Sequence, residues 1–474
     1  MGVSFLPTEK TIHFVGIGGI GMHGIASVLA KEGYKISGSD IRQTSITEYL
    51  ISLGITVYLH HHHDNIKNAS LVVRSTAISS DNPEIIAAYK EHIPVISRGE
   101  MLAELMQFRY GIAIAGTHGK TTTTAMIASI LYEAHKDPTF INGGLIKSFG
   151  TYNRLGKSKY FIVEADESDA SFLHLCPIVT VITNIESEHM NTYGNLDFLK
   201  KNFLDFLHKI PFYGHAIICL DNNLIRDLIP NIKRRIITYG FSKNADVRIM
   251  NYKQNGQKAY FSLRYAKNNN IFMTLNHTPG MHNALNAAAS FAVANQQNIN
   301  NKIICHALAK FQGIKRRFEL LGEFYLKNVN NTLCNVLIID DYGHHPTELE
   351  VTIKTVRLSW PTKRLVMIFQ PHRFTRTRDL YYDFVNVLSQ VDILILLNIY
   401  SAGERAIPKI NSKRLSNNIR KYGKINPILV TNDNVLLKIV RSVLLDNDVI
   451  LIQGAGNIRE LANILLSEIK DNND

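Results

Sequence analysis

The sequence predicts an α/β protein of three domains: a Rossmann-like N-terminal domain over residues 1–108, a central α/β domain over 109–313 and a Rossmann-like C-terminal domain over 314–474. Its 474 residues suggest roughly three domains at about 150 residues each. Short apolar runs alternate with segments of helical spacing, which is typical of parallel sheets covered on both faces. This alternation starts afresh twice along the chain, and the restarts set the two predicted boundaries.

The N-terminal domain contains a glycine-rich turn. Its first apolar run leads into GIGGIG, which matches G-x-G-x-x-G, and an acidic residue ends the next run. Backbone N–H groups at such a turn and at the helix that follows suit an anionic group. We interpret the turn as phosphate-binding rather than as glycines needed for packing, and the pattern does not specify NAD. The candidate residues are Gly16, Gly18, Gly19, Gly21 and Asp40, and the strands are expected at 11–19, 34–40, 55–60, 70–75 and 93–98.

The central domain begins with an apolar strand that runs into AGTHGKTTTTAM. The spacing is G-x-x-G-K-T, which is shorter than the usual G-x-x-x-x-G-K-[ST]. Gly116 and Gly119 would let backbone amides face phosphate oxygens, Lys120 would reach the β and γ phosphates, and the Thr121 hydroxyl would bind Mg²⁺. Four successive threonines are poor helix formers, so packing alone explains this stretch poorly. We therefore predict a P-loop-type ATP-binding central α/β domain.

Two acidic segments follow other strands of the central domain. Sites in α/β proteins form at the carboxyl ends of parallel strands, and carboxylates beside a phosphate loop favour a Mg²⁺ ligand. The acidic residues could instead be a charge cluster at a helix N-terminus, and a lone histidine is more often structural than a ligand. A histidine after a strand that neighbours the acidic one favours a functional role. The segments are VEADESDASF, with Glu164, Asp166, Glu167 and Asp169, and TNIESEHMNTYG, with Glu186, Glu188 and His189.

The rest of the chain adds a hairpin and the third α/β series. Residues 245–280 alternate around an Asn-Gly pair, which indicates an antiparallel hairpin, and helices are expected at 282–297 and 300–310. Five apolar runs of the C-terminal domain are expected to form strands: NVLIIDDYG, RLVMIFQ, DILILLNIY, NPILVTN and DVILIQGAGN. The first two continue into DDYGHHPTE and QPHRFTRT. Arg373 and Arg376 are three residues apart, and arginines that converge can clamp a carboxylate or a phosphate. The alternative for this segment is a solvated basic turn.

Composition narrows the class of protein. The net charge is +12, but Lys and Arg are spread along the chain without a dense basic block, so we predict no nucleic-acid partner. No apolar run approaches the roughly 20 residues of a membrane span, the N-terminus does not resemble a secretory signal, and the four cysteines are scattered. We therefore expect a cytoplasmic protein without membrane contact.

Four consecutive histidines in YLHHHHD, residues 58–64, are interpreted as a polar loop and not a metal site, because side chains alternate along a strand.

Taken together, the motifs resemble those of the Mur ligase family. Seven segments are similar to the characteristic motifs of that family and occur in the same order over nearly the whole chain. They are GTHGKTTT, EADESDASF, TNIESEH, GMHNALNAAA, IKRRFE, DDYGHHPTE and QPHRFTRT. The resemblance implies that the first domain binds a UDP-sugar, the second ATP, and the third the incoming amino acid and part of the nucleotide. The implied reaction is ATP-dependent amide formation between UDP-N-acetylmuramate and L-alanine through an acyl phosphate, with Mg²⁺ as cofactor.

Motif by motif, the resemblance assigns roles to residues of this chain. Lys120 would cradle the γ-phosphate, and Thr121, Glu164 and His189 would hold Mg²⁺. His344, Arg373 and Arg376 would meet the amino acid and the transferring phosphate. The implied ATP-binding residues are Gly116, Thr117, His118, Gly119, Lys120, Thr121, Thr122, Asn283, Arg317 and Asp341, and the UDP-sugar residues are Gly16, Gly18, Gly19, Gly21, Asp40 and Ser75.

Four positions depart from the family pattern: Thr76, Glu188, Asn191 and Ser401. A family member that attaches a preformed tripeptide to the same UDP-sugar is the nearest alternative, and HRFTRT, with two arginines for a small carboxylate, favours the single amino acid. A Rossmann NAD(P) oxidoreductase would leave the ATP loop unexplained. A basic nucleic-acid-binding ATPase would leave the third domain unexplained.

Overall fold

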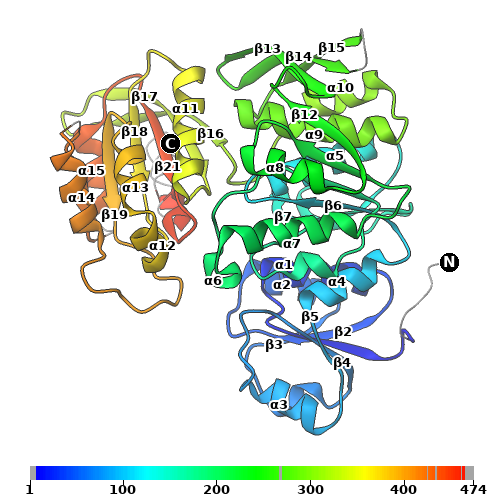
Figure 1. The fold of residues 1–474 in the computed structure, drawn as a ribbon. Coiled ribbons are helices and arrows are strands. Elements are labelled where there is room, and N and C mark those ends of the chain that lie inside the picture. Colours follow the sequence, from blue (N-terminus) through cyan, green and yellow to red (C-terminus); the bar gives the residue numbers. More distant parts are fainter. Residues whose placement is uncertain (1–6, 266–268, 424, 433–434, 461, 465–474) are drawn as a thin grey trace. The chain divides into compact units, whose positions relative to one another are not determined.

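A computed structural model describes residues 7–265, 269–423, 425–432, 435–460 and 462–464. These residues form three sheets of five, ten and six strands with helices packed against them, which confirms the predicted α/β class (Figure 1). The chain divides into two compact units. One unit takes most of residues 1–312 and contains the first two sheets, and the other takes 313–474 with the short segments 253–259 and 276–282. None of the described helices is long and apolar enough to cross a membrane.

The N-terminal sheet is parallel in the order β3-β2-β1-β4-β5. All five strands lie where the sequence predicts them. The strand order reverses direction between β1 and β4, and ligands of open α/β sheets bind at such a switch point. The elements are β1 (Thr11–Val15), α1 (Ile20–Lys31), β2 (Lys35–Ser39), α2 (Ser45–Ser52), β3 (Thr56–Tyr58), η1 (His63–Ile66), β4 (Ala69–Arg74), α3 (Pro83–Lys90), β5 (Val95–Ser97) and α4 (Arg98–Met106).

A buried carboxylate fastens the loop after β3 to this sheet. Glu84 at the start of α3 has no exposed surface. It accepts hydrogen bonds from Ser39 Oγ and Asn65 Nδ2, each at 2.6 Å, and lies 3.1 Å from His61 Nδ1 and 3.7 Å from His13 Nε2. Four polar partners offset the cost of burying this carboxylate.

The ionised form of Glu84 therefore stabilises the fold. Burial acts to raise the pKa of Glu84, but hydrogen bonds from His13, Ser39 and Asn65 outweigh burial and lower this pKa from 4.5 to about 2. A shift of this size corresponds to ~3 kcal/mol of stability, which is present above pH 4.5 and is lost as the pH falls toward 2.

We expect Glu84→Gln to lower the urea concentration at the unfolding midpoint of the first compact unit at pH 7. The amide removes the negative charge that the hydrogen bonds to Glu84 stabilise. The difference from the unsubstituted chain should narrow as the pH is lowered below 4.5. Glu91→Gln is the matched control, since Glu91 is exposed at the end of the same helix. Equal midpoints for Glu84→Gln and the parent at pH 7 would contradict the assignment.

The central sheet has the order β15-β14-β13-β12-β11-β10-β6-β9-β7-β8. Its parallel part runs from β13 to β7, and β13 and β14 are neighbours joined at Gly256 and Gln257, as the Asn-Gly pair predicts. The strands are β6 (Tyr110–Ala115), β7 (Thr139–Ile146), β8 (Thr151–Arg154), β9 (Tyr160–Glu164), β10 (Val179–Ile182), β11 (His215–Cys219), β12 (Arg235–Gly240), β13 (Val247–Asn255), β14 (Lys258–Tyr265) and β15 (Asn269–Leu275). The helices are α5 (Lys120–Glu133), η2 (Ser171–His174), α6 (Met190–Tyr193), α7 (Leu196–His208), α8 (Asn223–Leu228), η3 (Ile229–Asn231), α9 (Met281–Gln296) and α10 (Asn301–Lys310).

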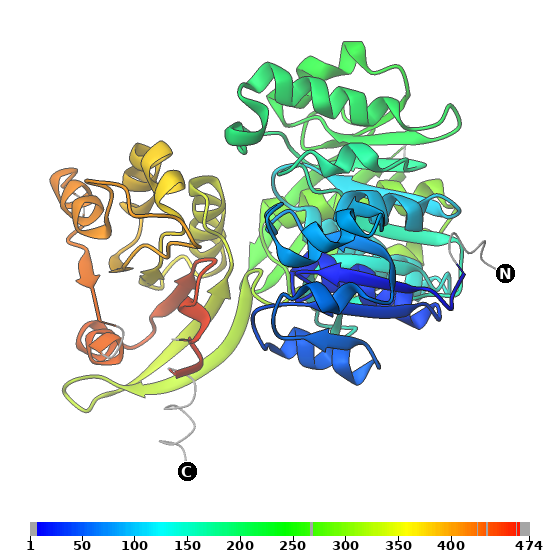
Figure 2. The same ribbon diagram turned by 90° about the horizontal axis from the view of Figure 1, so that it is seen from below.

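The C-terminal sheet has the order β16-β17-β21-β18-β19-β20. Five of its strands are parallel and were predicted, whereas β16, which pairs antiparallel with β17 as a long ribbon (yellow-green in Figure 2), was not. Apolar residues of α11, α13 and α14 cover one face and those of α15 the other. The elements are β16 (Glu319–Lys327), β17 (Leu333–Asp341), α11 (Pro346–Ser359), β18 (Leu365–Phe369), α12 (Phe374–Asp379), α13 (Tyr381–Leu388), β19 (Ile393–Leu397), α14 (Ser412–Lys421), β20 (Ile428–Val430), α15 (Leu436–Val443) and β21 (Val449–Gln453).

Candidate active site

The loop between β6 and α5 depends on its two glycines. Gly116 has φ +122°, and a Cβ there would lie 2.3 Å from Thr183 Oγ1. Gly119, with φ +85°, precedes α5, and a Cβ there would lie 2.7 Å from Asn286 Oδ1. No side chain caps α5 and its first turn has no acidic residue, whereas α2, α3, α4 and α7 begin with capping side chains. The N–H groups that begin α5 thus suit an anion, as the sequence predicts.

The segment after β10 braces this loop. The N–H groups of Thr117 and His118 donate to the backbone and side-chain oxygens of Asn184, at 3.0 and 2.8 Å. Thr183 Oγ donates to the carbonyl of His118 at 2.6 Å, and the N–H of Glu186 donates to Thr117 Oγ1 at 2.9 Å. Neither Thr183 nor Asn184 was singled out from the sequence, because a hydrogen bond between separate strand ends leaves no spacing pattern.

Lys120 is held by its own loop and by a buried carboxylate. Its Nζ donates to the carbonyl oxygens of Gly116 and Thr117, at 2.6 and 3.2 Å, and lies 2.8 Å from Glu167 Oε2. The Glu167 side chain is only 3% exposed and also lies 3.8 Å from His189 Nε2. The structure therefore brings Glu167, and not only Glu164, into contact with the predicted site.

The charges in this cluster support one another. Burial acts to lower the pKa of Lys120, but Glu167, Asp166 and Glu164 outweigh burial and raise it, so the amine stays an ammonium. Burial raises the pKa of Glu167 to about 7, although the ion pair with Lys120 opposes this. Above about pH 7 the two groups are therefore an ammonium and a carboxylate.

Glu164 and His189 flank the loop from opposite sides of β6. Glu164 ends β9 and accepts the N–H of Gly143 at 2.9 Å, while His189, with φ +58°, precedes α6 and lies 3.7 Å from Glu188 Oε2. The prediction that these residues follow neighbouring strands was wrong, because β6 lies between β9 and β10. Strand order is a tertiary property, and chain order did not reveal it. The carboxylate and the imidazole still follow strands that both border the loop-bearing strand.

Helix α9 is hydrogen-bonded to the start of helix α5, which follows the same loop. Asn283 is buried, and its Oδ1 accepts the Nδ2 of Asn286 at 3.2 Å. Asn286 Oδ1 in turn accepts the hydroxyl of Thr123 at 3.2 Å. The predicted adenine-facing residue Asn283 is therefore linked to the first turns of α5, where Thr121 and Thr122 are also buried.

The N-terminal fingerprint gathers the predicted UDP-sugar residues at the switch point between β1 and β4. The N–H of Gly18 donates to Asp40 Oδ2 at 2.9 Å, so Asp40 shapes the glycine turn itself. A Cβ on Gly16 would lie 3.1 Å from Ser75 Cβ. Helix α1 begins at Ile20, after Gly19, without a side-chain cap and with no acid in its first turn, so it presents N–H groups like α5.

Arg98 connects this turn to the central domain. A Cβ on Gly21 would lie 2.8 Å from Arg98 Nη1, and Arg98 Nη2 donates to Asp166 Oδ2 at 3.0 Å and lies 3.7 Å from Asp169 Oδ2. Asp166 and Asp169 thus hold an arginine of the N-terminal domain. An isolated arginine after a short strand carries no sequence signal, and Arg98 was not predicted.

In the second unit, Asp341 organises the strand end that was predicted to face ribose. It is buried, its Oδ2 accepts the N–H of Phe318 at 2.8 Å, and its Oδ1 accepts Gln453 Nε2 at 2.7 Å. Arg317 lies over the Tyr342 ring, with 5.3 Å between the guanidinium carbon and the ring centre. A ribose contact by Asp341 stays a prediction.

His344 and Arg376 meet at a histidine that was not predicted. Arg376 Nη1 lies 3.3 Å from His372 Nδ1, and the His344 and His372 rings are 5.4 Å apart. Burial, helped by Arg376, lowers the pKa of His344 to about 3 and that of His372 to about 4. Both imidazoles are therefore neutral at physiological pH, and the guanidinium is the cation of this cluster.

Arg373 has a different environment. It has φ +72°, which is uncommon for a residue with a side chain, its side chain is 52% exposed, and its Nη1 lies 4.0 Å from Glu404 Oε1. Glu404 also accepts the N–H of Thr375 at 3.0 Å. The two arginines of the predicted clamp therefore have separate partners, and Arg376 is the one beside His344.

Family models cover most of the chain. They are described as Mur ligase family, catalytic domain (residues 11–110), Mur ligase middle domain (114–294) and Mur ligase, glutamate ligase domain (316–456). These matches, together with the fold and the phosphate-type loop beside carboxylates, define an ATP-dependent ligase. The chain belongs to the Mur ligase family.

Solved structures of this family resemble the chain over most of its length. One is UDP-N-acetylmuramate-alanine ligase MurC from Thermotoga maritima, with 27% identity, a TM-score of 0.81, and coverage of 98% of this chain and 99% of that one. Another is a murein peptide ligase mpl from Psychrobacter arcticus, with 23% identity, a TM-score of 0.70, and coverage of 97% and 98%. MurF ligase from Thermotoga maritima in complex with ADP has 15% identity, a TM-score of 0.63, and coverage of 92% and 96%.

Proposed function

We propose that the protein joins L-alanine to UDP-N-acetylmuramate with consumption of ATP, in the formation of a peptidoglycan precursor in the cytoplasm. The observation that carries the proposal is the grouping around β6: the Lys120 loop ends this strand, and Glu164 and His189 follow the strands on either side. Likeness to the alanine ligase MurC over 98% of the chain supports the acceptor.

The proposed reaction has two steps. The lactyl carboxylate of the UDP-sugar attacks the γ-phosphorus of ATP, and ADP leaves. The amine of L-alanine then attacks the acyl carbon of the acyl phosphate, an amide forms, a proton leaves the amine, and inorganic phosphate departs. Two anions must approach each other in the first step, so cations must offset their repulsion.

Residues of each domain have a part in this proposal. The turn at Gly16 with Ser75 holds the uridine diphosphate, and the N–H groups of the loop with Lys120 hold the phosphates of ATP. The hydroxyl oxygen of Thr121, a carboxylate oxygen of Glu164 and the imidazole of His189 would be the ligands of Mg²⁺. This ion would neutralise phosphate charge there. In the C-terminal unit, Arg376 binds the carboxylate of L-alanine.

Phosphate release from ATP tests the reaction directly. The full chain is incubated with Mg²⁺, ATP and UDP-N-acetylmuramate, and single amino acids are compared with the preformed tripeptide. The proposal expects release with L-alanine far above that with the tripeptide. Preference for the tripeptide would move the protein to the function of the murein peptide ligases, and release without the UDP-sugar would exclude both.

A metal titration tests Glu164. We expect Glu164→Gln to raise the Mg²⁺ concentration for half-maximal activity at least about tenfold, because the amide loses the charge that a hard cation prefers. Asp169→Asn is the matched control, since Asp169 pairs with Arg98. An unchanged Mg²⁺ curve for Glu164→Gln would remove Glu164 from the metal site.

A further inference from the structure

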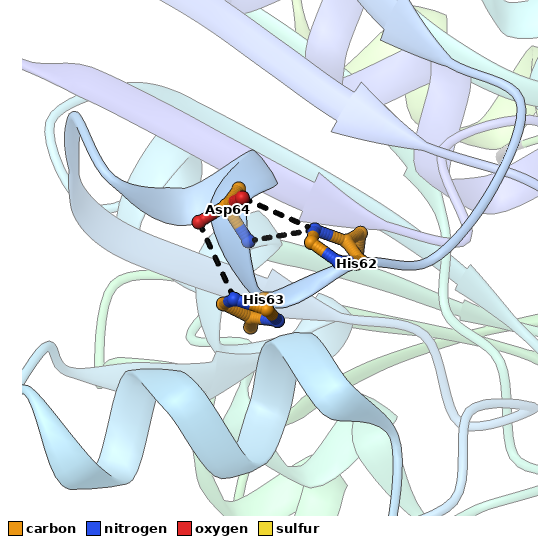
Figure 3. A group of neighbouring side chains, drawn as sticks. All are labelled: His62, His63 and Asp64. Atoms are coloured by element: carbon orange, nitrogen blue, oxygen red, sulfur yellow. Dashed lines mark hydrogen bonds and ion pairs between the residues drawn. The ribbon is translucent and has the colours of Figure 1, made fainter.

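The run of four histidines after β3 has a geometry that strand alternation does not describe. The 3₁₀ helix η1 begins at His63, so the chain turns within the run instead of continuing extended. His62, His63 and Asp64 consequently gather on one side of the turn, with their side chains pointing toward one another (Figure 3). The premise that consecutive side chains point to opposite sides was wrong for these three residues.

The spacing of these ligand atoms suits a small metal ion. His62 Nδ1 lies 3.5 Å from Asp64 Oδ2, and His63 Nε2 lies 3.4 Å from Asp64 Oδ1. One ligand atom from each of the three residues lies within 4.8 Å of the others. Two atoms bound to Zn²⁺ at about 2.0–2.1 Å with a tetrahedral angle are about 3.4 Å apart, which matches the observed separations. His62 Nδ1 also accepts the N–H of Asp64 at 3.3 Å, and it would exchange this hydrogen bond for the ion.

Hydrogen bonds to the buried core hold the turn in place, so its ligands are brought together before an ion binds. The buried Glu84 accepts Asn65 Nδ2 at 2.6 Å and lies 3.1 Å from His61 Nδ1. Asn65 Nδ2 also donates to the carbonyl of His60 at 3.0 Å. Residues on both sides of His62, His63 and Asp64 are therefore tied to the core, whereas those three side chains are about half exposed, at 47%, 62% and 45%.

We propose that His62, His63 and Asp64 form a binding site for a divalent transition-metal ion of the Zn²⁺ type. Two imidazoles and one carboxylate select such an ion over Mg²⁺ or Ca²⁺, which prefer oxygen ligands. Three protein ligands leave a position for water or an external ligand. Lys67 Nζ lies 2.8 Å from Asp64 Oδ1 and is the nearby cation that opposes the ion. The site is formed within the N-terminal domain and is separate from the residues assigned to Mg²⁺.

Calorimetric titration of the full, untagged chain with Zn²⁺ in excess Mg²⁺ tests this site. The chain has 19 histidines, so the comparison between variants decides the result rather than the total number of ions bound. We expect His62→Ala/His63→Ala to lose one Zn²⁺ equivalent. His174→Ala, a change at an exposed histidine elsewhere, should lose none. Both altered histidines are largely exposed, and an unchanged thermal unfolding curve checks that the variant is folded.

Two further variants distinguish a preorganised metal site from non-specific Zn²⁺ binding by histidines. Asn65→Ala releases the turn and should weaken Zn²⁺ binding about tenfold, as changes that misorient ligands do. Lys67→Ala removes the opposing cation and should strengthen binding, by about two- to threefold because Lys67 is exposed and screened. An unchanged number of Zn²⁺ equivalents in His62→Ala/His63→Ala would overturn the proposal. Unchanged affinity in both Asn65→Ala and Lys67→Ala would overturn the claim that the turn preorganises the ligands.

Discussion

Replacing Lys120 with alanine is expected to lower kcat by roughly 10²–10³-fold and to leave UDP-sugar binding intact. The ammonium is a largely buried cation of the loop, and carboxylates on neighbouring segments keep it charged. Without it, the charge that develops on the transferring phosphoryl group lacks its nearest protein cation. The residues proposed to bind the UDP-sugar belong to a different sheet, so binding of this substrate should not change.

Steady-state kinetics and UDP-sugar titration measure the two quantities separately. Lys120→Met keeps the buried volume and tests whether a loss of activity comes from unfolding rather than from the missing charge. Lys136→Ala, a change at an exposed lysine just after α5, is the matched control and should retain activity. Near-normal kcat in Lys120→Ala would show that this loop does not hold the phosphates.

Changing Arg376 to lysine should raise the KM for L-alanine by about 10- to 100-fold and alter that for ATP far less. Alanine has almost no side chain to recognise, so its carboxylate is the main group that the enzyme can bind. A charge-assisted hydrogen bond to this carboxylate contributes about 1.5–3 kcal/mol. Lysine keeps the charge but loses the planar fork. The neutral His344 and His372 beside Arg376 cannot supply the missing cation at physiological pH.

A second acceptor isolates the carboxylate. L-alaninamide lacks it and should be a poor acceptor for the parent enzyme, with little further loss in Arg376→Lys. Arg373→Lys is the matched comparison and should affect L-alanine less, because Arg373 lies beside Glu404. If Arg376→Lys weakens both acceptors equally, or affects ATP alone, Arg376 serves the phosphate instead of the amino acid.

Local patterns in the sequence predicted most strands and the two glycine-rich turns. Alternation of apolar runs and the position of Gly119 before a helix are encoded within a few residues, so they could be recognised directly. The edge strand β16 and the bracing of the loop by Thr183 and Asn184 depend on partners far along the chain.

The order of β9, β6 and β10 could not be deduced for the same reason, and it decides which side chains meet. Glu167 and His372 lay within quoted motifs, but only burial and neighbouring groups distinguish them from the residues beside them. Arg98 is visible only through its contact with Asp166. Sequence patterns indicated the candidate segments, and tertiary contacts show which of their side chains lie together.

The ion pair between Lys120 and Glu167 also affects how a nucleotide is received. Much of the water has already been removed from this ammonium when the chain folds, because the amine contacts two carbonyl oxygens and a buried carboxylate and its side chain is only 16% exposed. In the proposed role of Lys120, an incoming phosphate group would therefore exchange one anionic partner for another instead of removing water from a hydrated lysine. The carboxylate would then compete with the phosphate, which lowers nucleotide affinity, and would keep the amine charged and aligned between turnovers.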